Sequence, residues 1–336
     1  MALLRHMVPL ALAVFLALLA ALLPPTALWA AAQCVKALWP FHSSSAARME
    51  QNAWEVWERE VHGRKLAPDT VVELRIGDMP SRKHEPYIVR GLLNRTGSSL
   101  IGSFDWLMND PVGQLEVDFF TNASIEDGIV PNARAPLSDI VSNIVSGGSN
   151  KIGTEMIFRT FPDLLDELKV TELVAPLLGG SSHIRKSRIG TTLTVPVFMA
   201  TGAPGARTDL HCEPIGNLVL MLGGRKRWTL AAPNQSRYLR PTLSKDGRAY
   251  FVSSQPTENP EEALAHVKRW VVETGPGDVL WVPTWTWHRV DYLDGVTALS
   301  ASLFHFRIEQ VLPQNALYSA LAVPNVIKEL VGWKTQ

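Results

Sequence analysis

The sequence contains little cysteine and no excess of either charge. Its 336 residues include only two cysteines, and 32 basic side chains balance 32 acidic ones. Two cysteines cannot form a disulfide scaffold or a thiolate-based structural zinc site. The balanced charge, without any run of Lys or Arg, argues against a protein that binds nucleic acid mainly through its charge. A Gly-rich dinucleotide motif and an internal repeat are also missing, so neither a Rossmann-type nor a solenoid fold is indicated.

The N-terminal segment is apolar and almost uncharged. No residue in Met7–Val35 is charged, and the run Leu10–Leu23, which follows the basic Arg5, consists almost wholly of Ala, Leu, Val and Phe. A basic start before an apolar run is typical of a secretory signal peptide, for which Ala30–Ala32 offers a cleavage site. About 20 apolar residues would also span a bilayer. We therefore expect residues 1–36 to be either a signal peptide or a membrane anchor.

This expectation places the protein in the secretory pathway, in the lumen of the endoplasmic reticulum or Golgi, either soluble or held by a single membrane span. Three N-glycosylation motifs, which begin at Asn94, Asn122 and Asn234, agree with that location. Residues 37–85 are expected to form a polar spacer and an extension of helix and strand, with an amphipathic helix around Trp54.

The body of the chain has the pattern of a β protein. Short β-branched and aromatic runs are separated by Gly, Pro, Asn and Asp, which predicts a sandwich or barrel of many short strands. The predicted strands are Val71–Ile76, Tyr87–Val89, Gln114–Phe120, Thr191–Met199, Leu218–Leu222, Arg227–Leu230, Trp270–Glu273, Val279–Val282 and Val296–Phe306.

Helices are predicted between and after these strands. They are Leu137–Val145 with Ser138 as N-cap, Phe161–Leu168, Pro260–Val267 with Asn259 as N-cap, and Gln314–Ala322 and Val326–Val331 separated by Pro324. Within the C-terminal helices, residues 307–336, the segment Gln314–Val331 carries an apolar stripe, which would either pack on the β domain or form a homodimer contact.

Three residues have the spacing of a metal site. His211 and Glu213 are two residues apart, so on an extended strand both side chains point to the same face. His288, at the end of a later strand, is the best candidate for a third ligand. Two His and one carboxylate on one face leave coordination positions open, as in non-heme Fe(II) oxygenases, which admit a 2-oxo acid and O₂. The His-x-Glu triplet alone is weak, because many such triplets are surface polar residues.

Lys226 is the candidate for binding the co-substrate. It shares a strand face with Trp228 and Leu230, whereas its basic neighbours point the other way. A Lys among apolar side chains needs an anionic partner, and the distal carboxylate of a 2-oxo acid would provide one. Thr208 and Asn217 flank the metal motif and could hydrogen-bond the same ligand. The alternative is that Lys226 belongs to a solvated turn.

Together these residues resemble the JmjC/cupin-like family. The matching segments are Tyr87–Gly91, His211–Pro214, Gly223–Leu230, Pro276–Pro283 and Trp287–His288. The resemblance implies a double-stranded β-helix (jelly roll) over residues 86–306 with flanking helices, and Fe(II)- and 2-oxoglutarate-dependent chemistry. Carried over residue by residue, it assigns the iron to His211, Glu213 and His288, and 2-oxoglutarate to Lys226 with the help of Thr208 and Asn217.

Three positions depart from the family pattern. Small hydroxylases of the family more often carry Asp where Glu213 stands, and the last strand has Ser302 and Phe304 where other members have aromatic or Asn residues around the co-substrate. The longer Glu side chain can still bind iron, although it shifts the metal or tilts the carboxylate.

The favoured function is therefore a 2-oxoglutarate-dependent dioxygenase that hydroxylates a protein side chain in the secretory pathway. The expected partners are a protein or peptide substrate and the membrane if the N-terminal segment is retained, but no nucleic acid. The alternative is a catalytically silent cupin-like module that binds or assembles proteins in the lumen. A cupin isomerase or sugar-binding enzyme ranks last, because it would need a further His near His211.

Overall fold

The computed structural model describes residues 24–38, 43–78, 80, 84–122, 124–125, 131–178, 192–202, 205–244, 248–256, 258–293, 295–306 and 308–330. The chain forms two compact units. The first consists of Met1–Leu66, Asn234–Val267 and Asn315–Gln336, and the second of Ala67–Pro233 and Lys268–Gln314. The expected signal or anchor run Leu10–Leu23 lies outside the described residues. Among the helices that are described, none has the length and apolar character needed to cross a bilayer.

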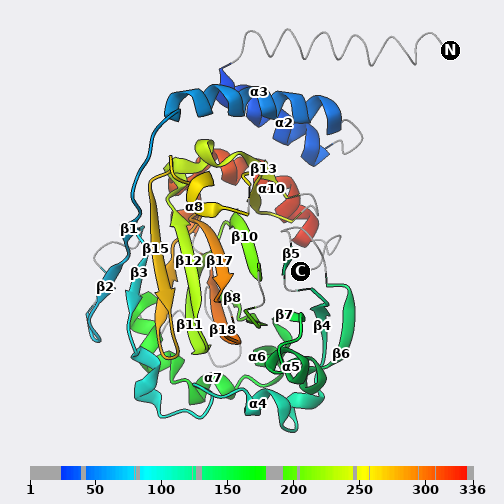
Figure 1. Ribbon diagram of the computed structural model, residues 1–336, viewed down its shortest axis with the longest axis vertical. Coiled ribbons are helices and arrows are strands. Elements are labelled where there is room, and N and C mark those ends of the chain that lie inside the picture. The colour runs from blue at the N-terminus through cyan, green and yellow to red at the C-terminus, as the bar shows by residue number, and fades with distance from the viewer. Residues whose placement is uncertain are drawn as a thin grey trace, which may run out of the picture. The chain divides into compact units, whose positions relative to one another are not determined.

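Two β-sheets form the second unit (Figure 1). In one sheet the strand order is β1 (Asp69–Thr70), β15 (Arg269–Thr274), β12 (Lys226–Ala231), β17 (Trp287–Tyr292) and β10 (Arg207–Cys212), and β5 (Ser124–Ile125) also pairs with β10. The ten-stranded sheet has the order β2 (Val72–Leu74), β3 (Tyr87–Val89), β16 (Val279–Val282), β11 (Gly216–Gly223), β18 (Ala298–His305), β9 (Val197–Ala200), β7 (Lys151–Thr154), β4 (Glu116–Phe120) and β6 (Ala133–Pro136), with β8 (Thr192–Thr194) on β18. This architecture confirms the mainly β, cupin-like fold.

Alternation along β11 explains how the two sheets pack. Val219 and Met221 point into the space between the sheets, where they join Trp228 and Leu230 of β12 in one buried cluster. The intervening residues of β11, such as Leu220, belong to a second cluster on the opposite face of the sheet. Because both faces are covered, the strand is buried throughout and is apolar apart from Asn217, so no alternating polar face remains.

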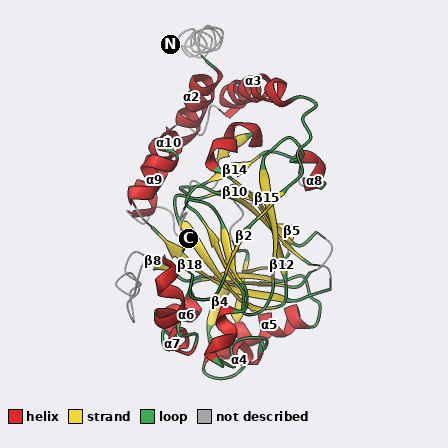
Figure 2. Cartoon of the chain, turned by 90° about the vertical axis from the view of Figure 1, so that its left-hand side faces the viewer, coloured by secondary structure: helices red, strands yellow, loops and turns green. Residues whose placement is uncertain are grey.

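Helices cover the outer face of the ten-stranded sheet (Figure 2). They are α4 (Asp105–Met108), α5 (Leu137–Val145), α6 (Met156–Thr160) and α7 (Leu164–Glu167), and α9 (Ile308–Gln314) follows the last strand. Short helical segments other than α-helix occur at η2 (Leu92–Thr96), η3 (Val112–Gln114), η4 (Val170–Val174), η5 (Ala175–Leu178) and η7 (Pro233–Leu239). The predicted bounds of α5 are confirmed, but Ser138 is not its N-cap. Pro136 occupies that position without a side-chain hydrogen bond, because the end of β6 fixes where the helix begins.

The first unit contains four helices and a strand pair among its described residues. They are α2 (Pro25–Leu38), α3 (Ser43–Val61), α8 (Pro260–Ala263), α10 (Ala316–Leu330), β13 (Pro241–Leu243) and β14 (Phe251–Ser253). Trp29 of α2 is 1 % exposed and contacts the rings of Trp57, Phe251 and Tyr318. Its indole Nε1 donates a hydrogen bond to the carbonyl of Pro241 at 2.7 Å. The core of this unit therefore depends on the helix that crosses the expected boundary at residue 36.

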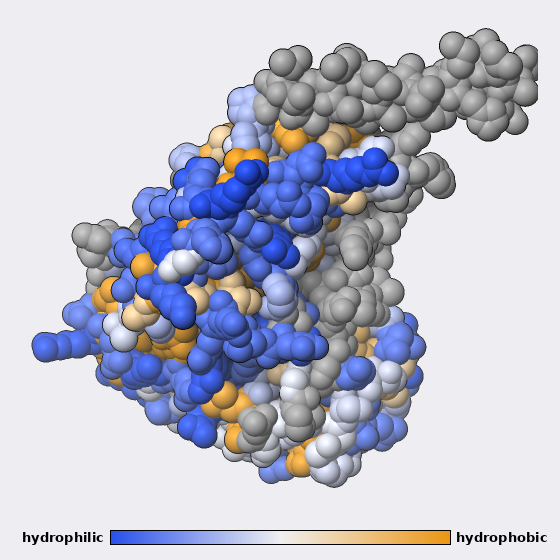
Figure 3. Space-filling view, turned by 45° about the horizontal axis from the view of Figure 1, so that its top comes forward, coloured by the Kyte–Doolittle hydropathy of each residue, from blue (hydrophilic) through white to orange (hydrophobic). Residues whose placement is uncertain are grey.

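The amphipathic helix expected around Trp54 is confirmed as α3, whose residues Glu55 and Arg59 are exposed while Trp57 is buried. The surface visible in Figure 3, where the top of Figure 1 comes forward, is mainly hydrophilic with scattered hydrophobic residues.

The C-terminal helix differs from its prediction. Pro324 was expected to separate two helices, but α10 continues through it. Buried contacts on both sides of the proline, including Leu321 and Asn325, outweigh the loss of one backbone hydrogen bond. The predicted cap of α8 is confirmed, because Asn259 accepts a hydrogen bond from the backbone of Glu262.

Candidate metal centre

The structure brings His211, Glu213 and His288 together. His211 on β10 lies directly opposite His288 on β17 in the antiparallel pair. A register shift between Thr208 and His211 accompanies this approach. One donor atom from each of the three residues lies within 4.8 Å of the others, and the two imidazole ring centroids are 4.1 Å apart. The pairing of two distant strands thus adds the third donor to the His-x-Glu pair.

Backbone hydrogen bonds orient both imidazole rings. The Nδ1 atom of His211 donates to the carbonyl oxygen of Asp209 at 2.8 Å, and Nδ1 of His288 donates to that of Thr286 at 3.0 Å. A proton on Nδ1 leaves the lone pair on Nε2, which is the form that binds a metal. Burial, and then the neighbouring His211, lower the pKa of His288 well below its usual range. The neutral imidazole is therefore favoured at physiological pH.

This donor set fits a divalent transition-metal ion. Two neutral imidazoles and one carboxylate on one side of the centre match the facial arrangement used for Fe(II). The site is largely enclosed, since His211 is 8 % exposed and His288 5 % exposed. The backbone N–H of Trp285 also donates to the carbonyl of Glu213, so the loop before β17 holds this carboxylate residue in place.

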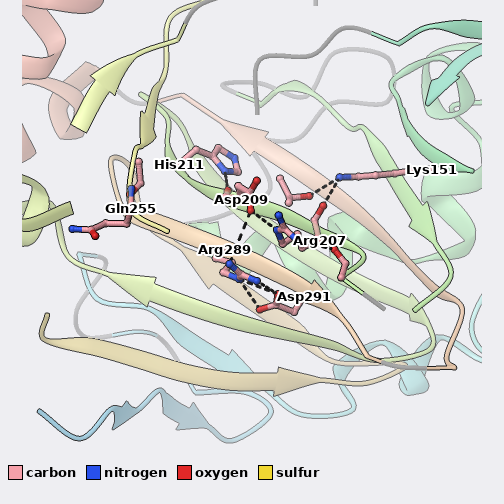
Figure 4. A network of polar contacts seen from close by, with 10 residues as sticks. Lys151, Arg207, Asp209, His211, Gln255, Arg289 and Asp291 are labelled. Carbon is pink, nitrogen blue, oxygen red and sulfur yellow. Dashed lines mark hydrogen bonds and ion pairs between the residues drawn. The ribbon is translucent and has the colours of Figure 1, made fainter. Parts of the chain in front are cut away.

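Charged residues behind the centre connect the two strands that carry the histidines (Figure 4). Arg207 and Asp209 of β10 form an ion pair at 2.6 Å, and Arg289 and Asp291 of β17 form another at 2.7 Å. Arg289 also lies 4.0 Å from Asp209, so the pairs are joined across the strands. Arg289 and Asp291 alternate with the inward-facing positions of β17, so the network lies on the face of the sheet opposite His288. It stabilises the pairing of β10 with β17 from that face.

Lys226 lies in the space between the sheets. It is 1 % exposed, whereas Arg225 and Arg227 are exposed, so the alternation expected from the sequence is present and the solvated-turn alternative is excluded. Its Nζ donates to Oγ of Ser300 at 2.7 Å and to the carbonyl of Phe198 at 3.3 Å. Within the described part of the chain, no carboxylate forms a salt bridge with Lys226.

The environment of this ammonium group suits an anion. Nζ of Lys226 lies 4.7 Å from the centroid of the Tyr292 ring, which faces it across the β12–β17 pair. Burial, and then the charge of Lys151, lower the pKa of Lys226 well below its usual range. A bound carboxylate would restore the favourable charge balance that this buried cation lacks.

The two other predicted co-substrate residues lie at different places in the interior. The hydroxyl of Thr208 on β10 accepts a hydrogen bond from Nζ of Lys151 at 2.9 Å. Asn217 of β11 is 5 % exposed, and its Oδ1 has no hydrogen-bond partner within the structure as described. The same is true of the buried hydroxyl of Ser302, which departs from the family pattern. Orphaned buried polar atoms cost about 1–3 kcal/mol each, so a ligand that satisfies them gains affinity.

Sequence reasoning did not identify Lys151, Tyr292 or Ser300. Tyr292 could have been found, because it lies four residues after His288 on the same strand and so shares its face. Lys151 belongs to β7, a strand of four residues that contains a glycine and was not predicted. Ser300 lies within a predicted strand, but nothing in its local sequence indicates that it meets Lys226.

Comparisons with known proteins agree with this geometry. The model of the cupin-like domain family matches residues 118–307, more than half of the chain. "HSPB1-associated protein 1" of Rattus norvegicus is 37 % identical over 101 residues, which cover 29 % of this chain and 21 % of that protein. The Homo sapiens protein of the same name is 36 % identical over the same shares. "HSPB1-associated protein 1 homolog" of Danio rerio is 34 % identical, over 29 % of this chain and 22 % of that protein.

The matched region thus spans about a fifth of the length of these relatives. The family model covers β10 to β18, which carry the His-Glu-His cluster and Lys226, so the resemblance seen in the sequence is confirmed. The chain belongs to the cupin-like domain family.

Proposed function

We propose that this chain is an Fe(II)- and 2-oxoglutarate-dependent dioxygenase that hydroxylates a protein side chain in the secretory pathway. The observation that carries the proposal is the convergence of His211, Glu213 and His288 within 4.8 Å. The buried Lys226, whose ammonium group forms hydrogen bonds to neutral partners and no salt bridge with a carboxylate among the described residues, supports it. When bound, iron and 2-oxoglutarate would together supply the O₂ activation that hydroxylation of a C–H bond requires.

The chain's own residues would hold and orient these groups. His211, Glu213 and His288 would hold the metal, each through one donor atom, and the carbonyls bound to both Nδ1 atoms fix the ring orientations. Lys226 would bind the distal carboxylate of 2-oxoglutarate by a charge-assisted hydrogen bond. Thr208 and Asn217 would add neutral hydrogen bonds, and burial of the site would exclude bulk water.

The substrate class and location follow from other features. The relatives are named for association with another protein, and we propose a protein or peptide substrate for this chain as well.

The apolar N-terminal run supports a place in the lumen of the secretory pathway, where the segment is a signal or an anchor. The three asparagines of the glycosylation motifs are exposed, so glycosylation would not disturb the fold. A mass decrease after treatment with an N-glycosidase would test the location, and unmodified protein from a secretory host would contradict it.

The competing function is a catalytically silent binding module. It is favoured by the names of the relatives, which state an association rather than an activity. Such a module would keep the fold but have no need for a metal.

Anaerobic titration of the full chain with Fe(II) and then 2-oxoglutarate separates the two functions. A visible metal-to-ligand charge-transfer band is expected in the wild type and not in His288→Ala. A matched control is Glu273→Gln, which changes a carboxylate of β15 whose side chain is 42 % exposed and should leave the band unchanged. Conversion of 2-oxoglutarate to succinate, measured with and without candidate peptides, then tests turnover. If the wild type binds neither Fe(II) nor 2-oxoglutarate, the dioxygenase proposal is wrong and the binding module remains.

A further inference from the structure

Helix α10 of the first unit carries apolar side chains on its exposed side as well as on its buried side. From Ala316 to Ile327 it contains no charged residue. Its large exposed side chains are Leu317, at 37 % exposure, Val323, at 49 %, and Ile327, at 53 %. A helix that is apolar on both sides is normally buried on both sides, so this pattern indicates that something further covers α10.

Buried contacts fix which side of α10 is exposed. Near the beginning of the helix, the ring centroid of Tyr318 lies 5.3 Å from that of Trp29 and 4.1 Å from that of Phe251. About two turns later, the side-chain amide of Asn325 donates a hydrogen bond to the carbonyl of Arg248 at 3.0 Å. Residues seven apart lie on the same side of a helix, so these contacts hold that side against the rest of the unit.

The opposite side, which is termed the α10 face below, consists of Leu317, Ala320, Val323 and Ile327. These residues are three or four positions apart, so they form one continuous stripe. Helix α3 of the same unit has the usual polar surface, with the exposed residues Arg48, Gln51, Asn52, Glu55, Arg59 and Glu60. The α10 face therefore differs from the water-facing side of a helix in its own unit.

The apolar N-terminal run Leu10–Leu23 directly precedes this part of the first unit in the sequence. Helix α2 begins at Pro25, two residues after the run. Trp29 is four residues farther along α2, a rise of about 6 Å, and it contacts Tyr318 near the beginning of α10 (Figure 2). A run that spans a bilayer would place Pro25 at the membrane surface, and the beginning of α10 close to it.

We propose that the α10 face binds the surface of the membrane, beside the N-terminal run that anchors the chain. This inference goes beyond the oxygenase function and depends only on the run being kept as an anchor. An interfacial helix inserts its apolar side about 5–10 Å into the boundary between headgroups and acyl chains. The other side of α10 packs on protein, so it needs no charged side chains to face water.

Tethering makes a small apolar face sufficient for lipid binding. A segment linked to an anchored one meets the membrane at a high effective concentration, so the α10 face need not bind lipid tightly by itself. A second copy of the chain is the other candidate occupant. Lipid is favoured over it because the anchor would bring the face to a bilayer in every molecule, whatever the protein concentration.

The test uses the full chain reconstituted in phosphatidylcholine vesicles. The exposed Cys34 is replaced by serine, and one new cysteine carries an environment-sensitive fluorophore, while the buried Cys212 is kept. The label in Ile327→Cys should emit at a shorter wavelength and lose most of its fluorescence to lipids with a nitroxide near the headgroup. Iodide in the water should not quench it. Since the face has no charge, high salt should not change these results.

Two exposed positions provide matched controls. Asn52→Cys places the label on the polar side of α3, and Val145→Cys places it at an apolar residue of the second unit that is 45 % exposed. Both labels should be quenched by iodide and not by the nitroxide lipid. Should Ile327→Cys fail to fold, Val323→Cys repeats the measurement on the same face.

Flotation of the labelled chain with the vesicles tests the anchor separately. A chain that does not float overturns the proposal and leaves the dioxygenase proposal intact. In a chain that floats, equal quenching at residues 52 and 327 would show that the α10 face has no special contact with lipid. A label at residue 327 that is shielded from iodide but not quenched by the nitroxide lipid would show that protein, such as a second copy, covers the face. Either result overturns the proposal.

Discussion

The backbone N–H of Trp285 donates a hydrogen bond to the carbonyl oxygen of Glu213 at 2.8 Å. Trp285 has a positive φ of 58° and is fully buried, at 0 % exposure. A bulky residue in this conformation costs about 1–3 kcal/mol, so the surrounding contacts must hold it there. Its indole Nε1 supplies one of them by donating to the carbonyl of Val311 at 3.0 Å. A strained residue thus connects one candidate metal ligand to the start of the strand that carries another.

Replacing Trp285 with Phe tests whether this strained residue supports the metal site. The variant loses the indole hydrogen bond to Val311, so we expect the free energy of unfolding to fall by about 1–3 kcal/mol. Because Glu213 is then held less firmly, the affinity for Co(II) should fall by about 10-fold. Urea unfolding and metal titration measure the two effects. Trp106→Phe is the matched control. Its indole N–H has no hydrogen-bond partner in the structure as described, and its ring packs against the hydrophobic cluster that contains Leu220. Unchanged Co(II) affinity in Trp285→Phe would refute the supporting role.

The sequence indicates those parts of the site that depend on strand alternation. The period of two places His211 with Glu213 and buries Lys226 between exposed arginines, and both follow from extended geometry alone. The backbone hydrogen bond from Trp285 to Glu213 cannot be predicted from this alternation. It joins residues that are far apart in the sequence, and it depends on the positive φ of Trp285. Lys151 was missed because β7 was not predicted and the sequence does not show which strands are its neighbours.

The ends of the helices also show which features local sequence signals predict and which depend on tertiary packing. Local signals predicted the cap at Asn259, which depends on residues within one turn. They failed at Pro324, where the packing of α10 within its unit decides the outcome.

The lowered pKa of Lys226 predicts how stability depends on pH. Burial, then Lys151, lowers the folded-state pKa, while the unfolded lysine keeps a pKa of about 10.4. Between these values the unfolded chain binds more protons, so the free energy of unfolding should rise with pH across this window. Below the folded pKa the full penalty of a buried cation is present. Urea unfolding at several pH values should show this slope in the wild type and a smaller one in Lys226→Met.

The solvent-exposed Lys268 provides the control for this pH dependence. Lys268→Met should keep the wild-type slope, because that side chain is 65 % exposed and does not lie in the interior with Lys226. Adding 2-oxoglutarate to metal-loaded protein should reduce the slope, since a carboxylate next to the ammonium raises the pKa of Lys226. A slope that is identical in wild type and Lys226→Met would show that this lysine is not responsible.

The ion pairs behind the metal centre should stabilise the pairing of β10 with β17. Arg289 has only 8 % of its side chain exposed and contacts both Asp209 and Asp291. In Arg289→Met two acidic groups lose a buried cation, so we expect the free energy of unfolding to fall by about 3–5 kcal/mol. Co(II) binding should also weaken, because the ring of His211 is hydrogen-bonded to the backbone carbonyl of Asp209.

Arg227→Met is the matched control for Arg289→Met. Arg227 also pairs with a carboxylate, that of Glu273, but 46 % of its side chain is exposed. Surface pairs contribute about 0–1 kcal/mol, so this variant should unfold almost as the wild type does. Equal losses in the two variants, measured by urea unfolding, would contradict the assigned role of the buried network.

The packing of Trp29 predicts where the mature chain begins. Cleavage at Ala30–Ala32 would remove Trp29 and break α2, although this indole is buried among three aromatic rings and bonds to Pro241. Losing a buried Trp side chain costs about 3–5 kcal/mol, so the first unit should not tolerate cleavage there. We therefore expect the mature protein to retain residues from Pro25 onward, with the preceding apolar run either kept as an anchor or removed before this helix. Mass spectrometry of the N-terminal peptide from a secretory host measures this directly. A peptide that begins after Ala32, from protein with an unchanged melting temperature, would show that α2 is dispensable.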